Sequence, residues 1–206
     1  MASSWDDSCR AFTDAANWFI RTTALVGDEW NRPGLGEWDV RALVGHTSRS
    51  LLTVEAYLAR PPAAVDIAST ADYYRATRAI AAGPGVAERG REAGAALGTD
   101  PAAAVTQIRD RVLRFVTGHD GTELVTTIAG GMRLADYLPT RTFELAVHTA
   151  DLATALGVPP DVPATAAAQA LDVVAQLAVA EGSAGPLLLA ATGRSGLSEG
   201  FTVLPW

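Results

Sequence analysis

The segment from Arg141 to Leu156 constrains the fold most, because its few ionisable side chains recur at helical spacing in an otherwise uncharged stretch. Steps of three and four residues separate them, which places them on one face of a helix. Leucines form a second stripe, and the remaining side is alanine, valine and threonine, so no charged face is left for solvent. We predict a helix buried on nearly all sides in a bundle core, with these groups pointing inward: Arg141, Glu144, His148 and Asp151.

Length and composition favour one all-α domain. The chain has 206 residues, and 49% of them are hydrophobic, with many alanines and few aromatic residues. Such a chain can bury a substantial core and lacks the composition of a disordered protein. We predict a four-helix bundle with a short β-hairpin and a small C-terminal helical extension. A single domain is expected over residues 1–206, with the bundle over 1–157 and the extension, packed on it, over 158–206.

Helical periodicity, interrupted by glycine and proline, predicts the order of the elements. Asp39 is a suitable N-cap for the second helix. The helix that carries Glu144 begins either near Ala135, with a kink, or at Pro139 itself. Other helices are expected over 5–26, 39–60, 71–81, 85–97, 101–117, 164–180 and 186–191, with Gly83-Pro84 separating the third from the fourth, and a hairpin is expected over 124–134.

Charge and cysteine content exclude several classes of protein. The net charge of −7 argues against a nucleic-acid-binding surface, and it gives no support for binding to an anionic membrane. Cys9 is the single cysteine, which excludes an internal disulfide and a cysteine zinc cluster. Neither a signal peptide nor a bilayer-spanning apolar stretch is evident. We expect a cytoplasmic protein with no nucleic-acid or membrane partner, and a homodimer stays open.

Glu144, His148 and His46 are the candidate metal ligands. Residues at positions i and i+4 of a helix are neighbours, so Glu144 and His148 can converge on one ion. His46 shares a face of the predicted second helix with core-type positions. Two histidines and one glutamate leave coordination positions open, as a catalytic zinc site requires. The alternatives without a metal are a buried, hydrogen-bonded His46 and an intrahelical hydrogen bond between the other two.

Three segments of the sequence are similar to a known family. They are residues 32–46 (RPGLGEWDVRALVGH), 137–152 (YLPTRTFELAVHTADL) and 187–194 (LLLAATGR). These segments resemble the mycothiol-dependent maleylpyruvate isomerase family of the DinB-like metalloproteins. The resemblance implies a DinB-like bundle and a divalent ion, usually zinc, on His46, Glu144 and His148. It also implies mycothiol or a similar low-molecular-weight thiol as cosubstrate, held by the metal as its thiolate.

Three further residues near these ligands are candidates for the site. Arg141, one turn before Glu144, is placed to bind a substrate or cosubstrate carboxylate through two hydrogen bonds. Asp151, one turn after His148, could orient an imidazole or assist proton transfer. Trp38 is expected to line the mouth of the pocket where the thiol binds. Arg141 and Asp151 could instead be ion-pair partners of Glu144 and Arg114 or of other neighbouring side chains.

Three functions fit these observations. The resemblance implies an enzyme that activates a mycothiol-like thiol for isomerisation or S-transfer on a small electrophilic acid, of which maleylpyruvate is one candidate among several. In isomerisation the thiolate adds to a conjugated cis double bond, the resulting single bond rotates, and the thiolate leaves again. The second function is a metal-dependent hydrolase that uses an activated water. The third is a non-catalytic bundle that binds a small molecule.

Overall fold

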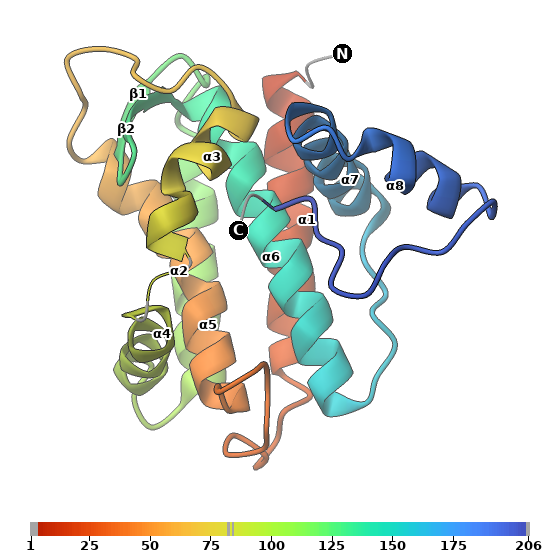
Figure 1. Cartoon of the computed structure of the whole chain (residues 1–206). Helices are drawn as coiled ribbons and strands as arrows, with labels where there is room; N and C mark the ends of the chain where they lie inside the picture. The colour runs from red at the N-terminus through yellow and green to blue at the C-terminus, as the bar shows by residue number, and fades with distance from the viewer. Residues whose placement is uncertain (1–3, 82, 84, 205–206) are drawn as a thin grey trace.

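The computed structural model of the chain describes residues 4–81, 83 and 85–204 (Figure 1). This part contains eight helices and one antiparallel hairpin, which confirms the predicted all-α fold with a short β-hairpin. Within it, no helix is long and apolar enough to cross a lipid bilayer. The helices are α1 (Trp5–Thr23), α2 (Val40–Leu58), α3 (Thr70–Ala81), α4 (Gly85–Ala96), α5 (Pro101–Val116), α6 (Leu134–Leu156), α7 (Ala164–Ala180) and α8 (Ala184–Ala191), and the strands are β1 (Leu124–Thr127) and β2 (Gly130–Arg133).

Helices α1, α2, α5 and α6 form a four-helix bundle. Both α1 and α2 pack against α5 and against α6, so the four helices surround one core (Figure 1). Full burial of a leucine or phenylalanine side chain stabilises a fold by about 1.5–3 kcal/mol, so this core holds the site-bearing helices α2 and α6 firmly in place. Its fully buried side chains include Phe12 and Phe19 of α1, Leu43 and Leu51 of α2, Val105 and Val112 of α5, and Leu138, Leu145 and Leu152 of α6.

Local sequence signals set the ends of α2 and α6. Asp39 caps α2 as predicted, because its carboxylate accepts a hydrogen bond of 2.7 Å from the backbone N–H of Ala42. Helix α6 begins at Leu134 and continues through Pro139, so the earlier of the two predicted starts is correct. Gly157 ends α6 in the left-handed conformation, with φ at 72°.

Helix α1 is shorter than predicted, because it ends at Thr23 and not at residue 26. The backbone N–H groups of Leu25 and Val26 bond three residues back, which is the pattern of tight turns and not of a continuing α-helix. The other predicted ends agree with the structure within two residues. Pro84, predicted to help separate the third and fourth helices, lies outside the described residues, as do residues 1–3 and 205–206 of the predicted domain.

The remaining helices cover the bundle from outside. Helix α4 packs on α2, α3 lies against α6 and α7, and α7 packs on α1 and α6 (Figure 1). Helices α2 and α4 meet at two glycines: a Cβ atom at Gly45 would lie 2.1 Å from the backbone nitrogen of Gly94. Such a close approach requires residues without side chains. Helix α8 packs on α7, and none of its residues is buried.

Candidate metal centre

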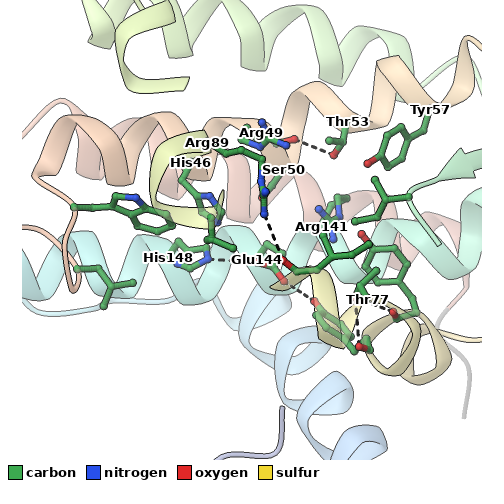
Figure 2. Close-up of a pocket in the computed structure, with 17 residues that line it drawn as sticks. His46, Arg49, Ser50, Thr53, Tyr57, Thr77, Arg89, Arg141, Glu144 and His148 are labelled. Atoms are coloured by element: carbon green, nitrogen blue, oxygen red, sulfur yellow. Dashed lines mark hydrogen bonds and ion pairs between the residues drawn. The ribbon is translucent and has the colours of Figure 1, made fainter. Parts of the chain in front are cut away.

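Helices α2 and α6 bring the three predicted metal ligands together (Figure 2). His46 extends from α2, and Glu144 and His148 extend from successive turns of α6. One potential ligand atom from each residue lies within 4.8 Å of the others. The Nε2 atom of His148 is 3.3 Å from Oε2 of Glu144, and the ring centroids of the two histidines are 4.9 Å apart. All three side chains are half-buried.

The arrangement fits a divalent ion. A tetrahedral zinc ion with ligand bonds of about 2.0–2.2 Å needs ligand atoms roughly 3.3–3.6 Å apart. The Glu144–His148 pair already has this separation, and one ligand atom of His46 lies within 4.8 Å of both. The Nδ1 atom of His46 is buried and has no hydrogen-bond partner in the described part of the chain. Buried polar atoms are normally satisfied, and a bound ion could supply a partner for this imidazole.

The three candidate ligands line a cavity of about 530 Å³ (Figure 2). Helices α2 and α6 supply most of its polar side chains, α3 adds mainly aromatic and apolar ones, and α4 adds one apolar and one charged side chain. A cavity of this size suits a small organic ligand. It is lined by Leu35, Trp38, His46, Arg49, Ser50, Thr53, Tyr57, Tyr73, Tyr74, Thr77, Ile80, Val86, Arg89, Ile128, Arg141, Glu144 and His148.

Hydrogen bonds on both oxygens keep Glu144 ionised. The hydroxyl of Tyr74 donates to Oε1 at 2.9 Å, and His148 lies 3.3 Å from Oε2. Burial by itself would raise the pKa of Glu144, but the hydrogen bond and charge of His148, with Arg141 and Tyr74, lower it to about 2. The carboxylate is therefore charged and ready to act as a ligand near neutral pH.

Two carboxylates hold His148 in place. Asp151 lies 3.1 Å from its Nδ1 atom, and Glu144 faces its Nε2 atom. Burial lowers the pKa of His148, but the hydrogen bonds with Asp151 and Glu144 outweigh burial and raise it to about 9. When His148 is neutral, a proton on Nδ1 bonded to Asp151 leaves Nε2 free to bind a metal ion.

His46 is held by packing against an aromatic ring. The indole of Trp38 stacks on its imidazole with centroids 4.4 Å apart, and the indole N–H donates to the carbonyl of Ala87 at 2.9 Å. Burial lowers the pKa of His46 to about 4, with a further contribution from the neighbouring His148. His46 is therefore neutral at physiological pH, the state in which imidazole binds metals.

Arg141 lies inside the cavity wall beside these ligands (Figure 2). Its side chain is 8% exposed, and the guanidinium lies over the rings of Tyr137 and Tyr73 at 4.8 and 5.5 Å from their centroids. Its Nε atom donates to the hydroxyl of Thr140 at 2.9 Å. The guanidinium is thus fixed by aromatic faces and keeps donors available toward the cavity.

The structure brings most of the predicted site residues to one cavity. Trp38 and Arg141 line it with the three candidate ligands, and Asp151 contacts His148 from behind. The predicted alternative of an ion pair between Arg141 and Glu144 is absent within 4.0 Å among the described residues.

Several residues of the cavity escaped the sequence analysis, among them Arg49, Tyr74 and Arg89. Arg49 had a local signal, because it lies one turn after His46 on the same helix. Tyr74 and Arg89 had none, because they reach the cavity only through the packing of α3 and α4.

Comparison with known proteins gives one match. The family model described as "Mycothiol maleylpyruvate isomerase N-terminal domain" matches residues 5–153. This range extends from α1 through most of α6 and contains all three candidate metal ligands. No curated protein and no solved structure matches the chain.

Proposed function

The chain belongs to the mycothiol maleylpyruvate isomerase N-terminal domain family, as its sequence segments predicted, and from this premise we propose that it is a divalent-metal-dependent enzyme that acts with a thiol. The proposed reaction is isomerisation or S-transfer on a small electrophilic acid such as maleylpyruvate, with a mycothiol-like thiol as cosubstrate. The observation that carries the proposal is the convergence of His46, Glu144 and His148 in the wall of one cavity.

His46, Glu144 and His148 would hold the ion, for which zinc is the best candidate. Two imidazoles and one carboxylate are typical zinc ligands, and three protein ligands leave room for a thiol or water. The ion, when bound, lowers the pKa of the thiol or water beside it. Asp151 supports binding, because its hydrogen bond to Nδ1 of His148 leaves Nε2 to face the site.

Three arginines around the cavity support an acidic substrate. Arg49, Arg89 and Arg141 line it, and across residues 4–81, 83 and 85–204 no carboxylate lies within 4.0 Å of their side-chain nitrogens. This excess of positive charge is local, because the whole chain has a net charge of −7. Guanidinium groups bind carboxylates through paired hydrogen bonds, and we assign this role to Arg141.

The protein's part in the reaction is to hold two reactants in position. Arg141 would bind the substrate carboxylate, and Trp38 would line the side of the cavity where the thiol enters. The thiolate sulfur adds to one carbon of the conjugated double bond, and the electron pair moves toward the conjugated carbonyl oxygen. Rotation about the new single bond, followed by loss of the sulfur, gives the isomer. In S-transfer, a proton adds to the adjacent carbon and the adduct is released.

We further infer that the chain works as one domain, with the bundle over 1–157 and the extension over 158–206. Packing of α7 on α1 and α6 supports this organisation. All the residues that line the cavity belong to the bundle. A cytoplasmic location belongs to the same proposal, because the cosubstrate must be a reduced thiol.

Elemental analysis of the purified chain beside its His46→Ala variant tests the proposal first. We expect about one divalent ion per chain in the wild type and its loss in the variant. The loaded protein is then assayed on electrophilic acids with and without a thiol. Turnover that requires the thiol supports the proposal, whereas turnover without it indicates a hydrolase. Failure to bind added zinc would reject the enzyme and favour a non-catalytic bundle.

Arg141→Ala tests the assignment of the acid-binding group. We expect binding of an acidic substrate to weaken about 10- to 100-fold, because charge-assisted hydrogen bonds contribute about 1.5–3 kcal/mol. Metal content should stay unchanged. An Arg141→Lys variant keeps the charge but not the two-pronged geometry, and it should recover part of the affinity. Equal loss of metal in Arg141→Ala would make this residue a structural support instead.

A further inference from the structure

We propose that Tyr74 is a positioning residue for the metal centre: it holds one carboxylate oxygen of Glu144 so that the other is presented to the ion. Tyr74 comes from α3, which supplies none of the three candidate ligands. The inference deepens the proposed function and rests on it.

The two oxygens of Glu144 have different neighbours. The hydroxyl of Tyr74 is 2.9 Å from Oε1, whereas Oε2 lies 3.3 Å from Nε2 of His148. A carboxylate can rotate and exchange its oxygens unless one of them is held. Because Tyr74 engages Oε1, Oε2 stays on the side of the two histidines, where the ion would bind.

Packing fixes the direction of the Tyr74 hydroxyl. Its side chain is 2% exposed, and its ring packs edge-on against Phe143 at 5.5 Å and against Tyr73 at 5.7 Å between centroids. The hydroxyl also lies 3.3 Å from the carbonyl oxygen of Thr140. A rigid side chain of this kind can orient a ligand to within the small tolerances that a metal site needs.

Both ligands on α6 are therefore held by a hydrogen bond on the side away from the ion. Asp151 holds His148, and Tyr74 holds Glu144. The two supports differ in origin, because Asp151 belongs to α6 itself and Tyr74 reaches α6 from α3. The geometry of the centre thus depends on how α3 is seated on the bundle.

Zinc affinity of the full chain, measured by competition with a chromogenic chelator, tests this role. We expect Tyr74→Phe to bind zinc about 10- to 100-fold more weakly, the usual effect of losing a group that orients a ligand. The cobalt-loaded variant should also show altered visible absorption, because that spectrum reports ligand geometry. Tyr137→Phe is the matched control: it also loses one buried tyrosine hydrogen bond, of 2.9 Å to Thr53, but its partner is not a ligand. Its zinc affinity should stay at the wild-type level.

A double-mutant cycle distinguishes positioning from a general effect on the fold. If Tyr74 acts through Glu144, Tyr74→Phe should have no further effect on zinc affinity in a Glu144→Ala background. Unchanged affinity in the single variant, or an equal loss in both backgrounds, would overturn the inference while leaving the metal site intact. A wild-type chain that binds neither zinc nor cobalt would overturn the proposed function together with it.

Discussion

His46 and His148 are the same kind of residue on two sides of one cavity, with ring centroids 4.9 Å apart, and their surroundings have opposite effects. On α2, burial against Trp38 lowers the pKa of His46 to about 4. On α6, burial acts in the same direction on His148, but Asp151 and Glu144 outweigh it and raise the pKa to about 9. The comparison teaches that neighbouring carboxylates, rather than burial, decide which imidazole carries a proton in the metal-free protein.

The different surroundings of His46 and His148 also predict different roles in binding an ion. His148 has both ring nitrogens engaged by carboxylates, so its orientation is fixed before a metal ion arrives. His46 has a stacked ring and an unpaired buried Nδ1 in the described structure. We expect the α6 side to determine the geometry of the centre, and the α2 side to complete it.

Removal of the histidine on α6 should have the largest effect. We expect His148→Ala to lower zinc affinity by more than the roughly 10- to 100-fold typical of a group that only orients a ligand, because a ligand itself is lost. Elemental analysis of the purified variant measures this. His119→Ala is the control, since this half-buried histidine near the end of α5 is not part of the candidate group. Full metal occupancy in His148→Ala would reject the three-ligand site.

The stability of the metal-free protein should depend on pH in two opposite ways. His148 is raised above its unfolded pKa of about 6.5, so it contributes stability below that pH and loses the contribution as pH rises through about 9. His46 is lowered, so its neutral state contributes above pH 6.5 and that contribution is lost as pH falls through about 4. The contribution of His148 to the free energy of unfolding should be at most about 3 kcal/mol.

Urea unfolding in a chelating buffer between about pH 3.5 and 10 measures both pH-dependent contributions to the free energy of unfolding. In the His148→Gln variant, the fall in unfolding free energy at alkaline pH should disappear and the fall at acid pH should remain. The His46→Gln variant should show the reverse. If both variants lose the same pH-dependent change, the two imidazoles titrate as one unit, and the contrast between His46 and His148 does not hold.

Loss of the carboxylate behind His148 should have an intermediate effect. We expect Asp151→Ala to weaken zinc binding about 10- to 100-fold, because the imidazole loses the group that fixes its tautomer. Chelator competition measures the change. Asp172→Ala removes an exposed carboxylate on α7 and should leave zinc affinity unchanged. Wild-type affinity in Asp151→Ala would mean that Glu144 and packing suffice to orient His148.

A change on the α2 side should have the smallest effect. Trp38→Phe keeps an aromatic ring next to His46 but removes the hydrogen bond of 2.9 Å to the carbonyl of Ala87. We expect a loss of about 1 kcal/mol in the free energy of unfolding, measured with urea, and an unchanged zinc affinity. A loss of affinity as large as that of Asp151→Ala would show that the indole orients His46 as firmly as Asp151 orients His148.

Local sequence patterns predicted α6 and its functional face well. The steps of three and four residues from Arg141 to Asp151 describe one helix face, and helix geometry then fixes the distance between Glu144 and His148. Asp39 likewise marked the start of α2 through a capping interaction that involves only neighbouring residues. The sequence also placed His46 on a core-facing side of the second helix, as either a ligand or a buried, hydrogen-bonded histidine, and the family resemblance favoured the ligand.

Contacts between distant segments were beyond the reach of such patterns. Tyr74 meets Glu144 only because α3 is seated against α6, and Arg89 enters the cavity only because α4 packs on α2. The stack of Trp38 on His46 depends on the path of the loop before α2. The end of α1 was also missed, because the tight turns after Thr23 depend on backbone hydrogen bonds that the sequence does not mark.

The crossing of α2 and α4 at Gly45 and Gly94 affects the width of the cavity but not the candidate metal ligands. The candidate metal ligands come from α2 and α6, whereas α4 supplies Arg89 and Val86 to a wall of the cavity. Because Gly45 and Gly94 have no side chains, α4 can pack this closely against α2. An alanine at position 94 would displace α4 and widen the chamber without altering a metal ligand. The width of the cavity and the candidate metal ligands can therefore change independently, through evolution or engineering, on the same small scaffold.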